Sequence, residues 1–264
     1  MTLLSLLLLG AICAPQEPTP ARPEPAGRER AEQRQPPAEP QPAKIDPKEL
    51  ARQRARAERL LRRHGKRSAE VDVLVADYTQ RRHTELSEKP LVSSGSFLFV
   101  REPACVVFRS ERPRTSTTRL TTTRYEVYRP ARKRLERFVL DGPELAQGLF
   151  AAVGGDAARL LRDFEVRGCD EVAGGGGSEE PAKAPQVVVR LRPNAEAVRK
   201  RLAELRITFV AETAELRAIA YRDGSGDLVE IELRALRPDP EDPPSAEIDV
   251  AEGTRVLEHR PAKR

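Results

Sequence analysis

Residues 93–110, SSGSFLFVREPACVVFRS, decide the fold class of this chain. Two short runs of apolar, β-branched and aromatic residues stand on either side of a Glu-Pro dipeptide that is typical of a turn. Runs of this length and composition favour β-strands. Phe97 and Phe99 alternate with Leu98 and Val100, so the two pairs should point to opposite faces of a sheet. The stretch therefore predicts neighbouring antiparallel strands.

The same short, period-two pattern extends on both sides of this stretch. A turn at Asp223-Gly224-Ser225-Gly226 is a strong hairpin signal between two of the later runs. The predicted strands are 71–83, 91–101, 104–110, 115–122, 123–129, 134–140, 186–192, 205–212, 216–222, 227–236 and a short last one at 246–250.

Helix signals interrupt the strands at three places. Asp46 is a plausible N-cap and Pro47 suits a first helical position, with Gly65 as the expected end of that helix. A helical interlude covers 143–164, with Asp156 capping its second helix, and 194–203 predicts a short helix or turn. Roughly ten strands with two or three helices predict an α+β fold with one large antiparallel sheet.

The N-terminal part has a different composition from the rest. The apolar run 3–12 is too short to span a bilayer and fits a signal peptide over 1–13. Acylation of Cys13 is the alternative, although the bulky Ile12 before it disfavours a lipobox. Nine prolines between 14 and 46 predict a disordered tether. The folded domain then spans 47–258, with a flexible glycine-rich acidic loop at 170–185 and a tail at 259–264.

Charge alone does not indicate a polyanion ligand. The chain has 46 Lys+Arg against 41 Asp+Glu, a formal charge of +5, and acidic residues are interleaved almost everywhere. The helix at 47–65 is strongly basic, and such a run could contact nucleic acid or anionic lipid. We favour a solvated helix face and expect no nucleic-acid partner.

The sequence offers no catalytic set. It contains no nucleophile elbow, zinc-protease motif, P-loop or dinucleotide fingerprint, and its three histidines are scattered. We therefore expect neither an enzyme, nor a cofactor, nor a metal site. Three cysteines cannot form a disulfide framework; Cys105 reads as a buried thiol, and a bond between Cys105 and Cys169 stays open.

The order of several segments is more informative than any one of them. These are ADYTQ at 76–80, GSFLFVREP at 95–103, LRDFEV at 161–166, the strand 187–193, the hairpin 219–227 and AEIDVAEGTRV at 246–256. In this order the chain resembles LolA, the periplasmic carrier of outer-membrane lipoproteins, and its relatives. The resemblance runs from about Leu60 to Val256. It departs from the family in having no Trp, and in placing Glu102 where carriers have an arginine before the turn proline.

The resemblance implies a fold and a function. The fold would be an incomplete, strongly curved antiparallel β-barrel whose concave face is covered by the helices. The function would be periplasmic transport of lipoprotein acyl chains as a monomer, without covalent chemistry. An inner-membrane lipoprotein-releasing transporter and an outer-membrane acceptor would be its partners.

The resemblance also directs attention to particular residues. Arg101, one position before Glu102, is the candidate latch that holds the helices closed. The candidate hydrophobic lining, drawn from apolar positions on neighbouring strands, is Phe97, Phe99, Phe108, Tyr125, Phe138 and Leu140. Three other functions stay open: a lipoprotein-sensing regulator of the RseB type, a LolB-like acceptor anchored through Cys13, and a polyanion-binding module.

Overall fold

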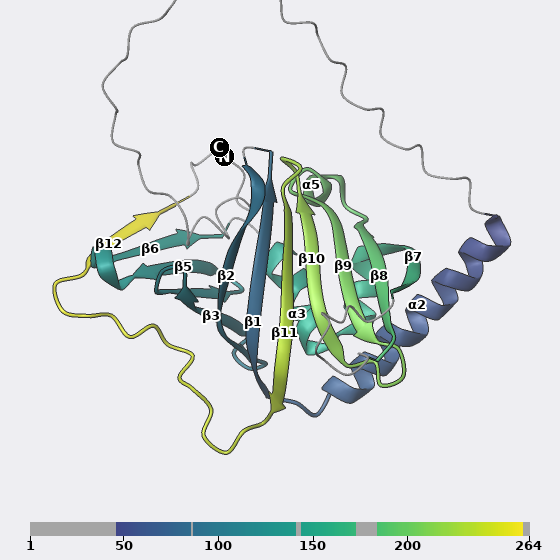
Figure 1. Ribbon diagram of the computed structural model, residues 1–264, viewed down its shortest axis with the longest axis horizontal. Helices are drawn as coiled ribbons and strands as arrows, with labels where there is room; N and C mark the ends of the chain where they lie inside the picture. The colour runs from purple at the N-terminus through teal and green to yellow at the C-terminus, as the bar shows by residue number, and fades with distance from the viewer. Residues whose placement is uncertain (1–45, 86, 141–143, 173–183, 261–264) are drawn as a thin grey trace, which may run out of the picture.

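A computed structural model of the protein describes residues 46–85, 87–140, 144–172 and 184–260 (Figure 1). The helices are α2 (Pro47–Ser68), α3 (Glu144–Gly154), α4 (Ala157–Asp163) and α5 (Glu196–Arg199), with a 3₁₀ turn at Pro130–Arg132. The strands are β1 (Val73–Thr84), β2 (Ser87–Val100), β3 (Cys105–Arg112), β4 (Ser116–Thr121), β5 (Arg124–Arg129), β6 (Arg134–Val139), β7 (Phe164–Val172), β8 (Gln186–Pro193), β9 (Leu202–Val210), β10 (Leu216–Asp223), β11 (Leu228–Pro238) and β12 (Arg255–His259).

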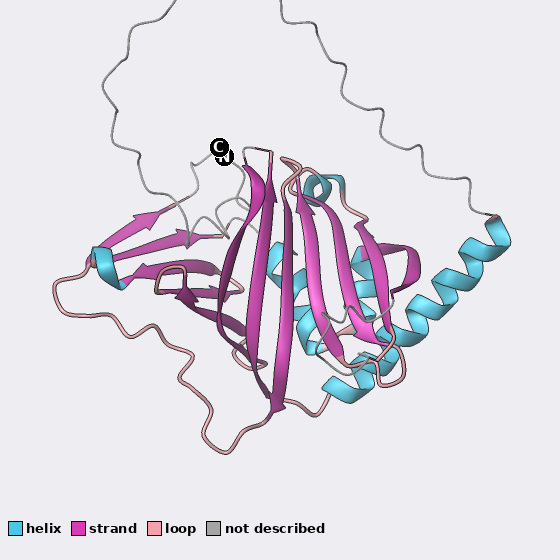
Figure 2. Ribbon diagram, in the orientation of Figure 1, coloured by secondary structure: helices cyan, strands magenta, loops and turns pink. Residues whose placement is uncertain are grey.

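All described strands belong to one open sheet. Its order is β12-β6-β5-β4-β3-β2-β1-β11-β10-β9-β8-β7, so β1 and β11 join an N-terminal and a C-terminal meander at the centre. Neighbours are antiparallel except β12 and β6, which are parallel. The sheet bends strongly, so that β3, β5 and β6 run across the direction of β1, and α3 lies behind β10 and β11 (Figure 1). The fold is therefore an incomplete, curved barrel of the α+β class, with helices on one face (Figure 2).

Local signals in the sequence explain several element boundaries. Asp46 caps α2 by accepting a hydrogen bond from the Lys48 amide at 3.0 Å, and Pro47 occupies the first turn, both as predicted. Asp156 caps α4 by accepting from the Arg159 amide at 2.9 Å. The Asp223 carboxylate accepts from the amides of Ser225 and Asp227, which fixes the predicted turn between β10 and β11.

The two faces of the sheet are both apolar near its centre. Phe97 and Phe99 belong to the main core on the inner face, whereas Leu98 belongs to a second cluster on the outer face. The predicted alternation of β2 is therefore confirmed. Residues 239–254 cross the outer face, where Ala246 packs against this second cluster. This segment, which we call the outer strap, explains why outward positions of β1–β3 need not be polar.

The strand predicted at 246–250 is wrong. Residues 246–251 form no strand, and side chains of the outer face contact them instead. Arg119 pairs with Glu247 at 2.9 Å, and Tyr128 Oη accepts a hydrogen bond from the Ala251 amide at 3.1 Å. The last strand lies later, in β12, and pairs in parallel with β6. His259 consequently belongs to a strand rather than to a tail, with its ring stacked on Phe138 at 4.4 Å.

Three helix predictions also differ from the structure. The short helix predicted at 194–203 covers only Glu196–Arg199, and Leu202 already begins β9. Gly65 does not end α2, which continues to Ser68; the glycine instead lies where the helix passes close to the chain between α3 and α4. Phe164 is the first residue of β7 rather than part of a helix. The predicted signal peptide at 1–13, including Cys13, and almost all of the tether at 14–46 lie outside the described residues, as does most of the loop predicted at 170–185.

Candidate functional site

The six residues predicted to line a cavity all contact the main core on the inner face. Phe97, Phe99 and Tyr125 are buried, with 3% or less of their surface exposed. The other three, Phe108, Phe138 and Leu140, are half-buried and pack against the same core. Rings on paired strands meet directly, Phe97 with Phe108 at 5.2 Å and Tyr125 with Phe138 at 5.9 Å between centroids. The six are thus part of the packed core or its margin, where ring contacts join four of them in two pairs, and their role as a cavity lining stays a prediction.

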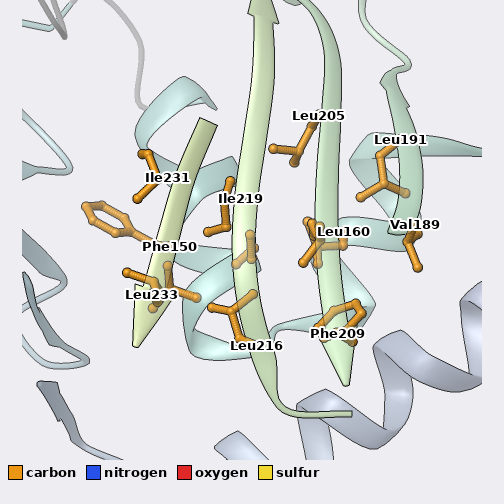
Figure 3. Packing of buried hydrophobic residues seen from close by; sticks show 14 of the residues in the cluster. Phe150, Leu160, Val189, Leu191, Leu205, Phe209, Leu216, Ile219, Ile231 and Leu233 are labelled. Carbon is orange, nitrogen blue, oxygen red and sulfur yellow. The ribbon is translucent and has the colours of Figure 1, made fainter. Parts of the chain in front are cut away.

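Helix side chains fill the inner face over the C-terminal strands. Phe150 of α3 and Leu160 of α4 lie among buried residues that point inward from the C-terminal strands, Phe150 near Ile231 and Leu233 and Leu160 nearer β9 (Figure 3). The labelled strand residues around them are Val189, Leu191, Leu205, Phe209, Leu216, Ile219, Ile231 and Leu233. Any ligand on this part of the inner face would have to displace the two helices or enter beside them.

A cleft of about 250 Å³ lies beside the helices, where the end of α2 and the end of α3 meet β1 and β11. Its apolar lining comes from both halves of the chain: Val71, Leu74, Phe99, Val153, Leu216, Leu236 and Pro238. Its polar lining is His64, Arg67, Ser68, Arg101 and Glu215, and Gly154 completes it. Of the six predicted lining residues, Phe99 borders this cleft.

Arg101 bridges the elements on two sides of the cleft. Its guanidinium donates to the carbonyl of Val71 at 2.9 Å, to that of Ser68, and to that of Gly154 at 3.3 Å. Ser68 ends α2 and Gly154 ends α3, so one side chain from the end of β2 ties both helices to the sheet. Hydrogen bonds from a charged donor contribute about 1.5–3 kcal/mol each when they are lost without replacement. The geometry suits a latch, and that role stays a prediction.

Close backbone approach at two glycines makes this helix contact possible. A Cβ on Gly65 would lie 2.6 Å from the Gly155 carbonyl oxygen. A Cβ on Gly154 would lie 2.9 Å from the ring of Phe99. Side chains at these positions would separate the two helix ends from each other or from the sheet.

His64 is a buried polar residue at the same contact. Its Nε2 lies 3.0 Å from the carbonyl oxygen of Ala152 in α3, its Nδ1 lies 3.3 Å from Ser68 Oγ, and its ring packs on Phe209. Burial lowers the pKa of His64, and the backbone carbonyls oppose that shift only in part. A neutral imidazole therefore connects α2 to α3.

Sequence reasoning missed most of the cleft. Leu74 and Leu236 lie on strands whose pairing across the chain could not be deduced from local pattern. Arg67 and Ser68 were placed beyond the predicted end of the first helix. The available signal was the period-two pattern of β1, which puts Leu74 on the same face as Ala76 and Tyr78.

Other sites in the described residues fit a ligand or a reaction less well. No group of three or more His, Cys, Asp or Glu residues within them could hold a metal ion. Cys105 and Cys169 are free and buried, and burial raises the pKa of both thiols. A hollow of about 510 Å³ on the outer face has a mixed lining, in which charged residues such as Arg81, Glu230 and Arg234 alternate with small and medium-sized apolar ones. None of the helices in this part of the chain is long and apolar enough to span a membrane.

Comparisons with known proteins found similarity in structure alone. No family model matches the sequence, and no curated protein matches it. A conserved, uncharacterised protein from Thermus thermophilus is 11% identical, with coverage of 77% of this chain and 99% of that one at a TM-score of 0.40. The lipoprotein LppX from Mycobacterium tuberculosis is 10% identical, with coverage of 74% and 98% at a TM-score of 0.39. A LolA superfamily protein from Nitrosomonas europaea is 13% identical, with coverage of 70% and 95% at a TM-score of 0.34.

Proposed function

We propose that this protein is a periplasmic carrier that binds the acyl chains of lipoproteins, or related lipids, between the helices and the inner face of its sheet. The observation that supports this most directly is the apolar cleft at the seam between helices and sheet, tied across by Arg101. Binding there needs no covalent chemistry. Because hydrophobic burial is non-directional and grows by about 25 cal/mol per Å², one such site can accept different cargoes that share acyl chains.

The present cleft is smaller than a typical ligand site. Small-molecule pockets are on the order of 300–1,000 Å³, whereas this cleft holds about 250 Å³. Loading a whole acyl chain therefore requires α3 and α4 to move away from the strands. The residues that now fill the inner face, such as Phe150 and Leu160, would exchange contacts with the strands for contacts with lipid.

A carrier of this kind needs two states of similar free energy. The closed state keeps apolar surface from water, and the open state is stabilised by cargo. Arg101 would set the balance, because its three bonds to backbone carbonyls exist in the closed arrangement. The proposed partners are an inner-membrane lipoprotein-releasing transporter, which loads the cargo, and an outer-membrane acceptor, which receives it.

Native mass spectrometry of the protein purified from its own cell envelope tests the proposal. We expect a bound species with the mass of a lipid or lipoprotein, and saturable binding of a fluorescent fatty-acyl probe to the stripped protein. Absence of any apolar probe binding to the stripped wild-type protein would refute the carrier function. Capture of cargo without transfer to any acceptor would favour the lipoprotein-sensing alternative.

A further inference from the structure

We infer that the cleft selects amphiphiles with an anionic head group, a carboxylate or phosphate joined to an acyl chain, over neutral ones. This inference rests on the proposed function, since it assumes that the apolar part of the cleft takes an acyl chain. It adds a second recognition element at the cleft's polar edge.

The lining of the cleft is divided between apolar and polar elements. The strand residues Leu74, Phe99 and Leu236 supply apolar wall. The polar side chains come from elsewhere: His64, Arg67 and Ser68 from the last turns of α2, Arg101 from the end of β2, and Glu215 from the loop before β10. A ligand with one apolar and one polar end matches this division.

Positive charge is in excess at the polar edge. Glu215 is paired with two arginines at once, Arg67 at 3.5 Å and Arg217 at 3.0 Å. Arg101 Nε also lies 3.9 Å from the carboxylate of Asp72, whose side chain is 84% exposed. An ion pair at this distance and exposure contributes little to stability. Among the residues that line the cleft, two guanidinium groups, those of Arg67 and Arg101, thus accompany one carboxylate, that of Glu215, which favours an added anion.

His64 adds no charge to this edge at neutral pH. Burial lowers the pKa of His64, and the nearby Arg67 lowers it further. Selection between anionic and neutral head groups at neutral pH therefore depends on the arginines. Arg67 is the better placed to meet a ligand, because about half of its side chain is exposed.

Opening of the cleft would change the set of hydrogen-bond acceptors around the guanidinium of Arg101. Its donors are now taken by the carbonyls of Val71, Ser68 and Gly154. Movement of α3 removes the Gly154 carbonyl, and a partly buried guanidinium that loses an acceptor is destabilised. An anionic head group would replace that acceptor with a stronger one. A neutral amphiphile would open the cleft without this compensation.

Matched ligands separate the head group from the chain. Calorimetric titration with decanoate and with decanol at pH 7.5 compares one chain with and without the negative charge, and acetate supplies the charge without the chain. We expect decanoate to bind about tenfold more tightly than decanol, which corresponds to one charge-assisted hydrogen bond. Acetate at the same concentrations should neither bind nor displace decanoate.

Two variants of α2 locate the effect. Arg67→Gln removes the charge at the cleft and should reduce the preference for decanoate to about threefold or less, with decanol binding unchanged. Arg59→Gln removes an exposed charge from the same helix, outside the cleft lining, and should leave the preference at the wild-type value. A circular dichroism melt of each variant confirms that it is folded.

Each outcome decides between the proposals. Equal binding of decanoate and decanol by the wild type, or an undiminished preference in Arg67→Gln, overturns the head-group inference and leaves the carrier function standing. Displacement of decanoate by acetate shows a small-anion site and also overturns it. Failure of both ten-carbon ligands to bind overturns the carrier function itself, and the inference with it.

Discussion

The guanidinium of Arg101 at the end of β2 donates a hydrogen bond to the carbonyl of Gly154 at the end of α3, across 3.3 Å. The same side chain also bonds Ser68 at the end of α2. Three elements that are distant in the sequence therefore meet at one side chain, which bonds both helix ends to the end of a central strand.

Replacement of Arg101 by Leu should favour the open arrangement. Loss of the carbonyl bonds should raise amide hydrogen exchange at the end of α3, because local opening becomes less costly. An apolar acyl probe should bind at least as tightly, and cargo should pass more slowly to an acceptor. Arg109→Leu is a matched control, since Arg109 also donates to a backbone carbonyl, that of Ser245, but on the outer face. Delivery by Arg101→Leu at the wild-type rate would show that Arg101 is no latch.

Phe97 and Phe99 allow core packing to be separated from ligand contact. The two rings lie on the same strand and face, with 2% and 3% of their surface exposed, but only Phe99 borders the cleft. Phe97→Ala should reduce the free energy of unfolding by about 3–5 kcal/mol. Phe99→Ala should reduce it less and should weaken acyl-probe binding more. Denaturant unfolding and probe titration measure the two effects; equal losses of binding in both variants would contradict a specific role for Phe99.

Gly65→Ala should destabilise the contact between α2 and the chain after α3. Alanine favours a helix interior over glycine by about 1 kcal/mol, so an increase in stability is expected where space allows. Here the added Cβ would lie 2.6 Å from the Gly155 carbonyl oxygen. Overpacking of this kind costs about 1–3 kcal/mol, so we expect a net decrease in the thermal midpoint. A thermal midpoint above that of the wild type would mean that the backbone at Gly155 moves away enough to accommodate the added methyl group.

Stability should decline below neutral pH because of His64. Burial lowers its pKa from the ordinary value of 6.5. The unfolded chain then binds the proton at a higher pH than the folded one, so stability is lost as pH falls from about 6.5 through the folded pKa. His64→Gln should flatten this part of the pH profile of unfolding, whereas His83→Gln, at a half-exposed site paired with Glu230, is the control. Identical profiles for the wild type and His64→Gln would exclude this effect.

Local sequence patterns predicted most of the elements but missed the two edge strands, β7 and β12, and they predicted the long-range pairing poorly. The alternation of Phe97 and Phe99, the cap at Asp46 and the turn at Asp223 depend on neighbouring residues, and all three were predicted correctly. The strand at 246–250 was wrong because a segment that alternates apolar and acidic residues while Ala246 packs on the outer face has the same pattern as a strand. The cleft was largely missed because Leu74 and Leu236 meet only after β1 pairs with β11.

The central pairing of β1 with β11 has a consequence for how the chain folds. Leu74 faces Pro238, so this pair can form only after almost the whole domain has been synthesised. Closing so long a loop is entropically costly, and proteins dominated by such contacts fold on the order of milliseconds to seconds. The hairpins of β2–β6 and of β7–β11 involve shorter loops and should form earlier. Until the two meanders join, the apolar inner faces of both stay exposed, which makes the half-folded chain the species most in need of protection from aggregation.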